Sequence, residues 1–114
     1  MTLTVTAYRI VRSAEGEQND PIAISSNLAG VEEARTSFYG ATAERLGLVI
    51  LPRLVASDLW VGGSELGALR AEVGRLMADL TAEEKPYWEL RLSNILEAIE
   101  EASAHGSDGL VVIE

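Results

Sequence analysis

Several residue types are absent or scarce in this chain of 114 residues, and each absence excludes a class of site. There is no cysteine, which excludes a disulfide, a thiolate metal site and a cysteine nucleophile. The only histidine is His105, and no cluster of metal-ligating residues accompanies it. No serine lies in a G-x-S-x-G motif. We therefore predict no catalytic residue, no metal site and no cofactor, and an enzyme is the least favoured class.

Basic residues are also few. The chain has nine Lys and Arg residues and 18 Asp and Glu residues, which gives a net charge of −9. Nucleic acids and anionic membrane surfaces are bound through clusters of Lys and Arg, so the charge argues against both as partners. It is compatible with a basic protein partner. Solubility alone also explains an acidic chain, and that alternative stays open.

Length and composition favour a single domain over residues 1–114. An apolar share of 47% is sufficient for a hydrophobic core. The first ten residues lack the pattern of a secretory signal, and no apolar run is long enough to cross a bilayer. We therefore expect a cytoplasmic protein. Arginine greatly outnumbers lysine, and Ala, Gly and Leu are abundant, as in proteins from GC-rich bacterial genomes.

The segment at residues 63–80 has the clearest helical pattern. Ser64 is an expected N-cap, since its hydroxyl can accept a bond from a free N–H of the first turn. At about 100° per residue, one broad stripe is apolar. It contains Leu66, Leu69, Val73, Leu76, Met77 and Leu80. The predicted polar side contains Glu65, Glu72, Arg75 and Asp79.

The remaining pattern predicts an α+β fold, with a small mixed sheet covered by about three helices. The sheet combines an N-terminal hairpin with a central C-terminal strand. Strands are expected at residues 2–12, 22–25 and 110–113, with a polar loop at 13–20. Further helices are expected from Asn27 or Gly30 to Gly47, and from Pro86 to about Ala104. Residues 81–84 have the spacing of a capping box, and residues 48–62 form a buried connector with room for a short strand.

One flank of the first-described helix contains only small residues: Gly67, Ala71, Gly74 and Ala78. Each interior glycine costs a helix about 1 kcal/mol relative to alanine. A backbone that packs very close would compensate for this cost. We expect that contact to be intramolecular, and the alternative is a seam between two subunits.

Two further features suggest a protein-binding surface. Trp60 precedes a double glycine, and exposed tryptophans are enriched at binding hot spots, although a Trp between Leu59 and Val61 usually packs into the core. Acidic residues lie on the polar side of the last helix: Glu89, Glu97, Glu100 and Glu101. They form a candidate surface for a basic partner, with Trp60 as an apolar anchor, and a solvated helix face is the alternative.

The stretches GGSELGALRAEVGRL, RLSNILEAIEEA and GLVVIE resemble small bacterial α+β proteins without an assigned function, some of them of immunity-protein type. The resemblance covers the C-terminal half and consists of packing residues, so it transfers no site residue. It implies a non-enzymatic protein-binding module, of immunity or regulatory type. The alternative is a homodimeric structural or scaffold protein.

Overall fold

Strand β1 (Thr2–Ser13) is the axis of a five-stranded sheet in the structure, a computed structural model that describes residues 2–114. On one edge β1 pairs with β2 (Gly16–Ile22) and β3 (Leu28–Val31), and on the other with β5 (Gly109–Ile113). Strand β4 (Leu59–Gly62) pairs with β5. The α+β class and the central place of β5 are confirmed. The sheet is antiparallel throughout rather than mixed.

Alternation along β1 separates the two faces of the sheet, as the sequence predicts. Leu3, Val5 and Ala7 are fully buried and face the helices. The intervening Thr4 and Thr6 point to the other face, because successive side chains of a strand alternate. The covered face thus supplies one wall of the hydrophobic core.

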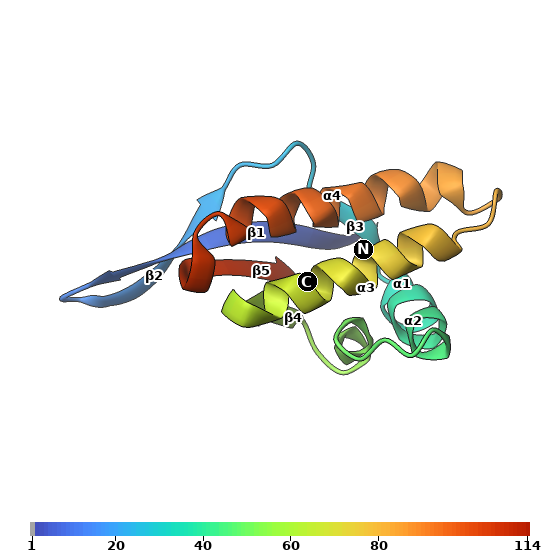
Figure 1. Ribbon diagram of the computed structural model, residues 1–114, viewed down its shortest axis with the longest axis horizontal. Helices are drawn as coiled ribbons and strands as arrows, with labels where there is room; N and C mark the ends of the chain where they lie inside the picture. The colour runs from blue at the N-terminus through green and yellow to red at the C-terminus, as the bar shows by residue number, and fades with distance from the viewer. Residues whose placement is uncertain (1) are drawn as a thin grey trace.

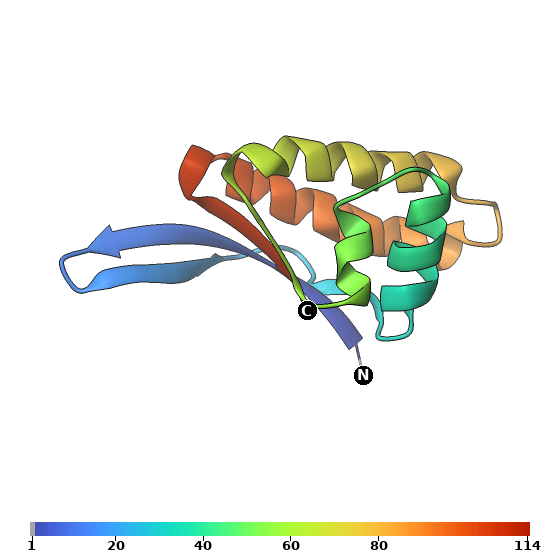
Figure 2. The same ribbon diagram turned by 90° about the horizontal axis from the view of Figure 1, so that it is seen from below.

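Helices α3 (Leu66–Asp79) and α4 (Lys85–Ser103) lie side by side over that covered face (Figures 1 and 2). The predicted capping box is confirmed, since the Thr81 amide donates to Glu84 Oε1 at 2.9 Å and the Glu84 amide donates to Thr81 Oγ1 at 3.3 Å. The predicted cap at Ser64 is wrong. A 3₁₀ turn, Gly63–Glu65, precedes α3, so Ser64 lies inside this turn and makes no cap hydrogen bond.

A third helical stretch comprises α1 (Ala34–Thr36), a π-helical segment (Ser37–Thr42) and α2 (Ala43–Arg45). Its side chains pack on the end of α4, where the rings of Phe38 and Trp88 stack with centroids 3.7 Å apart. The helix ends before Gly47, whose φ of +79° confirms the predicted glycine stop.

The region between β1 and this helix differs from the prediction. Strand β2 begins at Gly16, inside the expected polar loop, and ends at Ile22, where the second strand was expected to begin. Strand β3 occupies residues where a helix was expected to start. Pairing with β1 explains both corrections, because an antiparallel neighbour can hold a polar, exposed segment in an extended conformation.

The far ends of β1 and β2 extend beyond the helices as an arm (Figure 1), and the molecule measures 50 × 26 × 26 Å. Arg12 on this arm forms ion pairs with Asp108 and, at 2.9 Å, with Glu17. The hydrogen bond to Asp108 raises the pKa of the Arg12 guanidinium. Within residues 2–114, no helix has the length and apolar character needed to cross a membrane.

Candidate functional site

The second face of the sheet bears no long helix in the described part of the chain (Figure 2). Six residues in register form its centre, which we call the open face. One row is Trp60, Val112 and Thr6, and the next row is Gly62, Leu110 and Tyr8. Registered neighbours share a face of the sheet, so these side chains stand next to one another. None of the six is charged.

Trp60 is the most exposed large side chain of the open face, with 55% of its surface accessible. The expectation that it fills the core is wrong. Strand β4 alternates, and its neighbours Leu59 and Val61 are the residues that face the helices. Trp60 must therefore point the other way. Val112, only 1% exposed on a face with no helix, is registered between Trp60 and Thr6.

Apolar exposure continues from the open face onto β3. Leu28 and Val31 are 43% and 45% exposed, and they are registered opposite Thr4 and Thr2 of β1. At the same end of the sheet, Glu114 exchanges backbone hydrogen bonds with Thr4. The acidic residue thus borders the apolar surface without entering its two central rows.

Arg35 positions the start of β4 and therefore Trp60. Its guanidinium donates to the carbonyl oxygens of Leu54 at 3.0 Å and Ser57 at 2.9 Å, and to Asp58 Oδ1 at 3.1 Å. A bond from Arg35 Nε to Glu32 at 2.8 Å is the main cause of a raised pKa of the Arg35 guanidinium. One side chain thus ties the α1 region to the loop that precedes Trp60.

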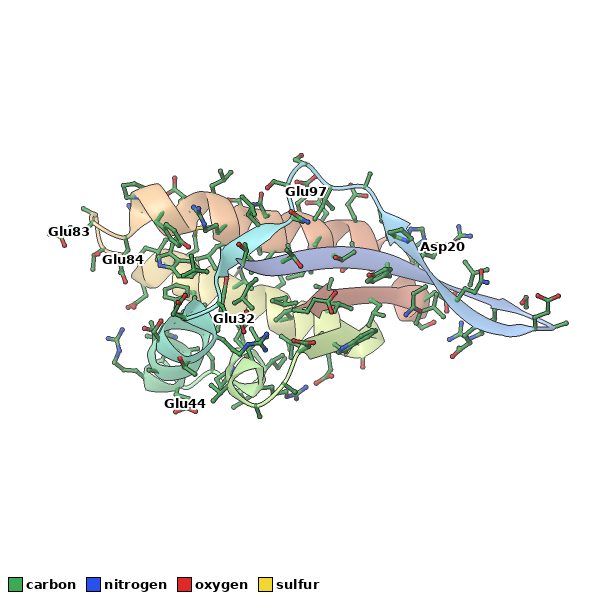
Figure 3. All side chains as sticks on the ribbon, turned by 180° about the vertical axis from the view of Figure 1, so that it is seen from behind. Asp20, Glu32, Glu44, Glu83, Glu84 and Glu97 are labelled. Atoms are coloured by element: carbon green, nitrogen blue, oxygen red, sulfur yellow. The ribbon has the colours of Figure 1, made fainter. Side chains whose placement is uncertain are left out.

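Helix α4 covers the face of the sheet opposite to the open face (Figure 2), so its acidic residues do not lie on the open face with Trp60. Glu89, Glu100 and Glu101 are exposed. Glu97 is partly buried and lies beside the loop between β2 and β3 (Figure 3), where it accepts hydrogen bonds from the amide and hydroxyl of Ser25, both at 3.1 Å. The structure thus does not bring Trp60 next to these four residues. The exposed apolar residue on α4 is Leu90.

The predicted small-residue seam on α3 makes no close contact within the chain. Gly67, Ala71, Gly74 and Ala78 are all exposed. A Cβ added to Gly67 or Gly74 would meet no atom within 4 Å. The expected intramolecular contact is therefore wrong, and a contact with a second subunit stays a prediction. The close approach of backbones occurs elsewhere, at Gly109, where a Cβ would overlap the carbonyl oxygen of Ala102 on α4.

Glu72 was predicted on the polar side of α3, and the structure corrects this. It is only 8% exposed, and its carboxylate accepts hydrogen bonds of 2.9–3.1 Å from the backbone amides of Val49, Ile50 and Leu51. The sequence held a signal, since Glu72 is three residues after Leu69 and four before Leu76, both buried. Its role is to satisfy the amides that begin the 3₁₀ turn Leu51–Val55.

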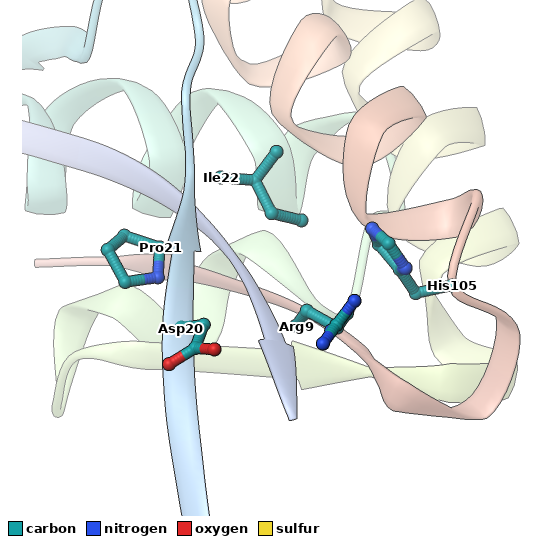
Figure 4. A pocket seen from close by; sticks show the side chains of 5 residues that line it. All are labelled: Arg9, Asp20, Pro21, Ile22 and His105. Atoms are coloured by element: carbon teal, nitrogen blue, oxygen red, sulfur yellow. The ribbon is translucent and has the colours of Figure 1, made fainter. Parts of the chain in front are cut away.

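One hollow, of about 320 Å³, lies between the base of the arm and the end of α4 (Figure 4). Its lining residues are Arg9, Asp20, Pro21, Ile22 and His105. All five are exposed or only partly buried, so the hollow is open to water. No set of three or more His, Asp or Glu side chains within residues 2–114 is arranged to hold a metal ion.

Comparison with known proteins adds no relative: no family model, no curated protein and no solved structure matches this chain. The resemblance to immunity-type proteins therefore stays a prediction.

Proposed function

We propose that this protein is a non-enzymatic protein-binding module whose contact surface is the open face. The observation that carries the proposal is the exposure of Trp60 on a face of the sheet whose six central residues carry no charge. The centres of protein interfaces are depleted in charged residues and enriched in Trp and Tyr. Tyr8 and Trp60 occur together on this face, and neither is part of the core.

Burial of Trp60 would supply a useful amount of binding free energy. A tryptophan side chain buries about 150–250 Å² when it is fully covered. Since 55% of Trp60 is accessible, a partner can remove about 100 Å² from water. At about 25 cal/mol per Å², this corresponds to about 2.5 kcal/mol, or nearly a hundredfold in affinity.

A photo-crosslinking experiment in the source cells tests this proposal. A photoreactive phenylalanine analogue replaces Trp60 in one variant and Leu90 in a matched control, because Leu90 is similarly exposed but belongs to α4, which covers the other face of the sheet. We expect a polypeptide adduct from position 60 and none from position 90. Absence of an adduct at position 60, or equal adducts at both positions, would contradict the proposal.

A second candidate function is recognition of a basic protein through α4, as an immunity-type or regulatory protein would require. Residues 92–103 of α4 contain three acidic residues and no Lys or Arg, and two of the three, Glu100 and Glu101, are exposed. Leu90 lies on the same helix and is 63% exposed, so in this second candidate Leu90, and not Trp60, is the apolar anchor of the surface. Charge across such a contact mainly increases the association rate, and salt weakens this effect.

Reversal of charge at Glu100 and Glu101 to Lys tests the second candidate without disturbing Glu97, which has a structural role. The probe is a basic protein crosslinked at position 90, on α4. We expect a slower association rate at low salt, with an unchanged circular dichroism spectrum. Binding that is insensitive both to salt and to these reversals would leave the α4 acids as a solvated surface.

A further inference from the structure

We infer that the occupant of the open face is a second copy of this chain, which forms a two-fold symmetric dimer with the two sheets face to face. This inference rests on the proposed function and names the partner of the same surface. It is drawn from the charge and the shape of the face, and the size of the face sets the expected strength of the dimer.

The charge of the molecule is distributed in a way that suits a second copy. The chain carries −9 overall, yet the six central residues of the open face carry no charge. A foreign partner of a strongly acidic protein would be expected to use that charge for recognition. The centre of the open face has no charged residue that such a partner could recognise. A contact between two identical surfaces needs no opposite charges, and here the exposed acids of α4 stay on the far sides of both copies.

The shape of the face complements itself. The two rows form a grid in which the rings of Trp60 and Tyr8 occupy diagonal corners. The small residues Thr6 and Gly62 occupy the other diagonal, and Val112 and Leu110 lie between the columns. Each ring therefore has a small residue next to it along its own strand, Gly62 beside Trp60 and Thr6 beside Tyr8, and the other small residue lies at the far end of its row.

Two identical sheets stacked face to face are related by a two-fold axis in the plane between them. An axis parallel to the strands exchanges the outer columns, so that Trp60 faces Thr6 of the second copy and Tyr8 faces its Gly62. An axis across the strands exchanges the rows, so that Trp60 faces Gly62 and Tyr8 faces Thr6. Either symmetry places each ring over a small residue, which allows the sheets to approach to the usual spacing of about 10 Å.

The size of the face sets the strength of the dimer. Four strands about 4.8 Å apart, with five residues of about 3.3 Å each, form a patch of about 300 Å² in projection. Leu28 and Val31 extend it onto β3. Stable interfaces bury at least about 600 Å² per partner. In projection the patch is only about half of that area, so we expect a weak, rapidly reversible dimer with a dissociation constant in the high micromolar range.

Sedimentation velocity of the full chain, from about 1 to about 500 µM, measures this dimer. We expect the fraction of dimer to rise with concentration. Raising the salt from about 0.05 to about 0.5 M should tighten the dimer, because it screens repulsion between two acidic copies. A chain that stays monomeric up to the highest concentration would overturn the inference.

Two variants separate this dimer from unspecific association. Trp60→Ala should weaken the dimer by about tenfold or more, while the Leu90→Ala control leaves it unchanged. Thr6→Tyr should also weaken it, because a second ring would then oppose Trp60 or Tyr8, although the variant adds aromatic surface. If Thr6→Tyr tightens association, the contact is unspecific and the proposed symmetry is wrong.

The outcomes distinguish this inference from the proposed function. If the chain is monomeric but an adduct with a different polypeptide forms at position 60, the open face binds a foreign protein and only the second copy is excluded. If a dimer forms that is indifferent to Trp60, and no adduct forms at position 60, both are wrong.

Discussion

The two faces of the sheet differ in the exposure of their side chains, and adjacent residues of strand β4 show the difference. Leu59 and Val61 on the covered face are at most 2% exposed, whereas Trp60 between them is 55% exposed. The covered face holds the helices, and its side chains determine stability. Of the six central residues of the open face only Val112 is buried, so packing of the core constrains the composition of this face less. The comparison predicts that stability and association can be changed separately.

The largest expected effect comes from a comparison of truncations at two adjacent residues, Leu59 and Trp60. Leu59→Ala should destabilise the fold by about 3 kcal/mol, because it leaves a cavity under the helices. Trp60→Ala should change the free energy of unfolding by less than about 1 kcal/mol. Urea unfolding at low protein concentration, where dimer is absent, measures both values. Equal losses would show that Trp60 belongs to the core after all.

The covered side depends on one carboxylate as well as on apolar packing. Glu72→Leu should cost about 2–3 kcal/mol, because the amides of Ile50 and Leu51 lose their acceptor in a buried position. Glu72→Gln, which keeps one acceptor oxygen, should cost less. Hydrogen exchange should become faster at these two amides in both variants. A Leu variant as stable as the wild type would mean that other groups can satisfy the amides.

Two tyrosines extend the comparison to high pH. The Tyr39 hydroxyl is buried and donates to the Ala29 carbonyl at 2.6 Å, and burial raises its pKa. A raised pKa in the folded state means that stability is complete below about pH 10, the pKa of an unfolded tyrosine, and falls as the pH rises above it.

Tyr39→Phe should therefore cost about 1 kcal/mol at neutral pH and remove this part of the alkaline destabilisation. Tyr8→Phe on the open face is the control and should leave the stability of the monomer nearly unchanged. Thermal unfolding between pH 7 and pH 11 makes the comparison. An unaltered alkaline profile in Tyr39→Phe would show that other groups govern it.

The smallest expected effect is a gain. Gly67 and Gly74 face open space on α3, so Gly67→Ala and Gly74→Ala should each stabilise the protein by about 0.5–1 kcal/mol. Gly109→Ala is the matched control and should destabilise it, since the added Cβ overlaps the backbone of α4. Loss of stability in the α3 variants that depends on protein concentration would instead reveal a subunit seam there.

Sequence patterns predicted the elements in which a periodic apolar pattern extends over many residues. The alternation of β1, the apolar stripe of α4 and the capping box at residues 81–84 all gave elements close to those observed. Strand β2 was missed because no periodic apolar signal marks it, and only pairing with β1 makes it extended. The burial of Glu72 was missed because the backbone amides that donate to its carboxylate belong to residues 49–51. These residues lie in a connector that has no recognisable sequence pattern.

The candidate site was only partly predictable. Trp60 was identified from its sequence neighbours, but its exposure follows from the pairing of β4 with β5. These strands are far apart in the chain, so no local sequence pattern predicts their pairing. The glycines of α3 suggested close packing because each lowers the stability of a helix. This cost does not show whether a glycine faces a neighbouring backbone or solvent. The true contact at Gly109 depends on where α4 ends relative to β5.

The pairing of β1 with β5 has a consequence for the order of folding. These strands meet across 110 residues of sequence at Thr4 and Glu114, and such distant pairings form slowly because a long loop must close first. The neighbouring helices α3 and α4 can associate earlier. Trp60, Leu110 and Tyr8 become neighbours only when β5 enters between β4 and β1. The open face is therefore complete only in fully folded chains, and a folding intermediate cannot offer it to the proposed partner.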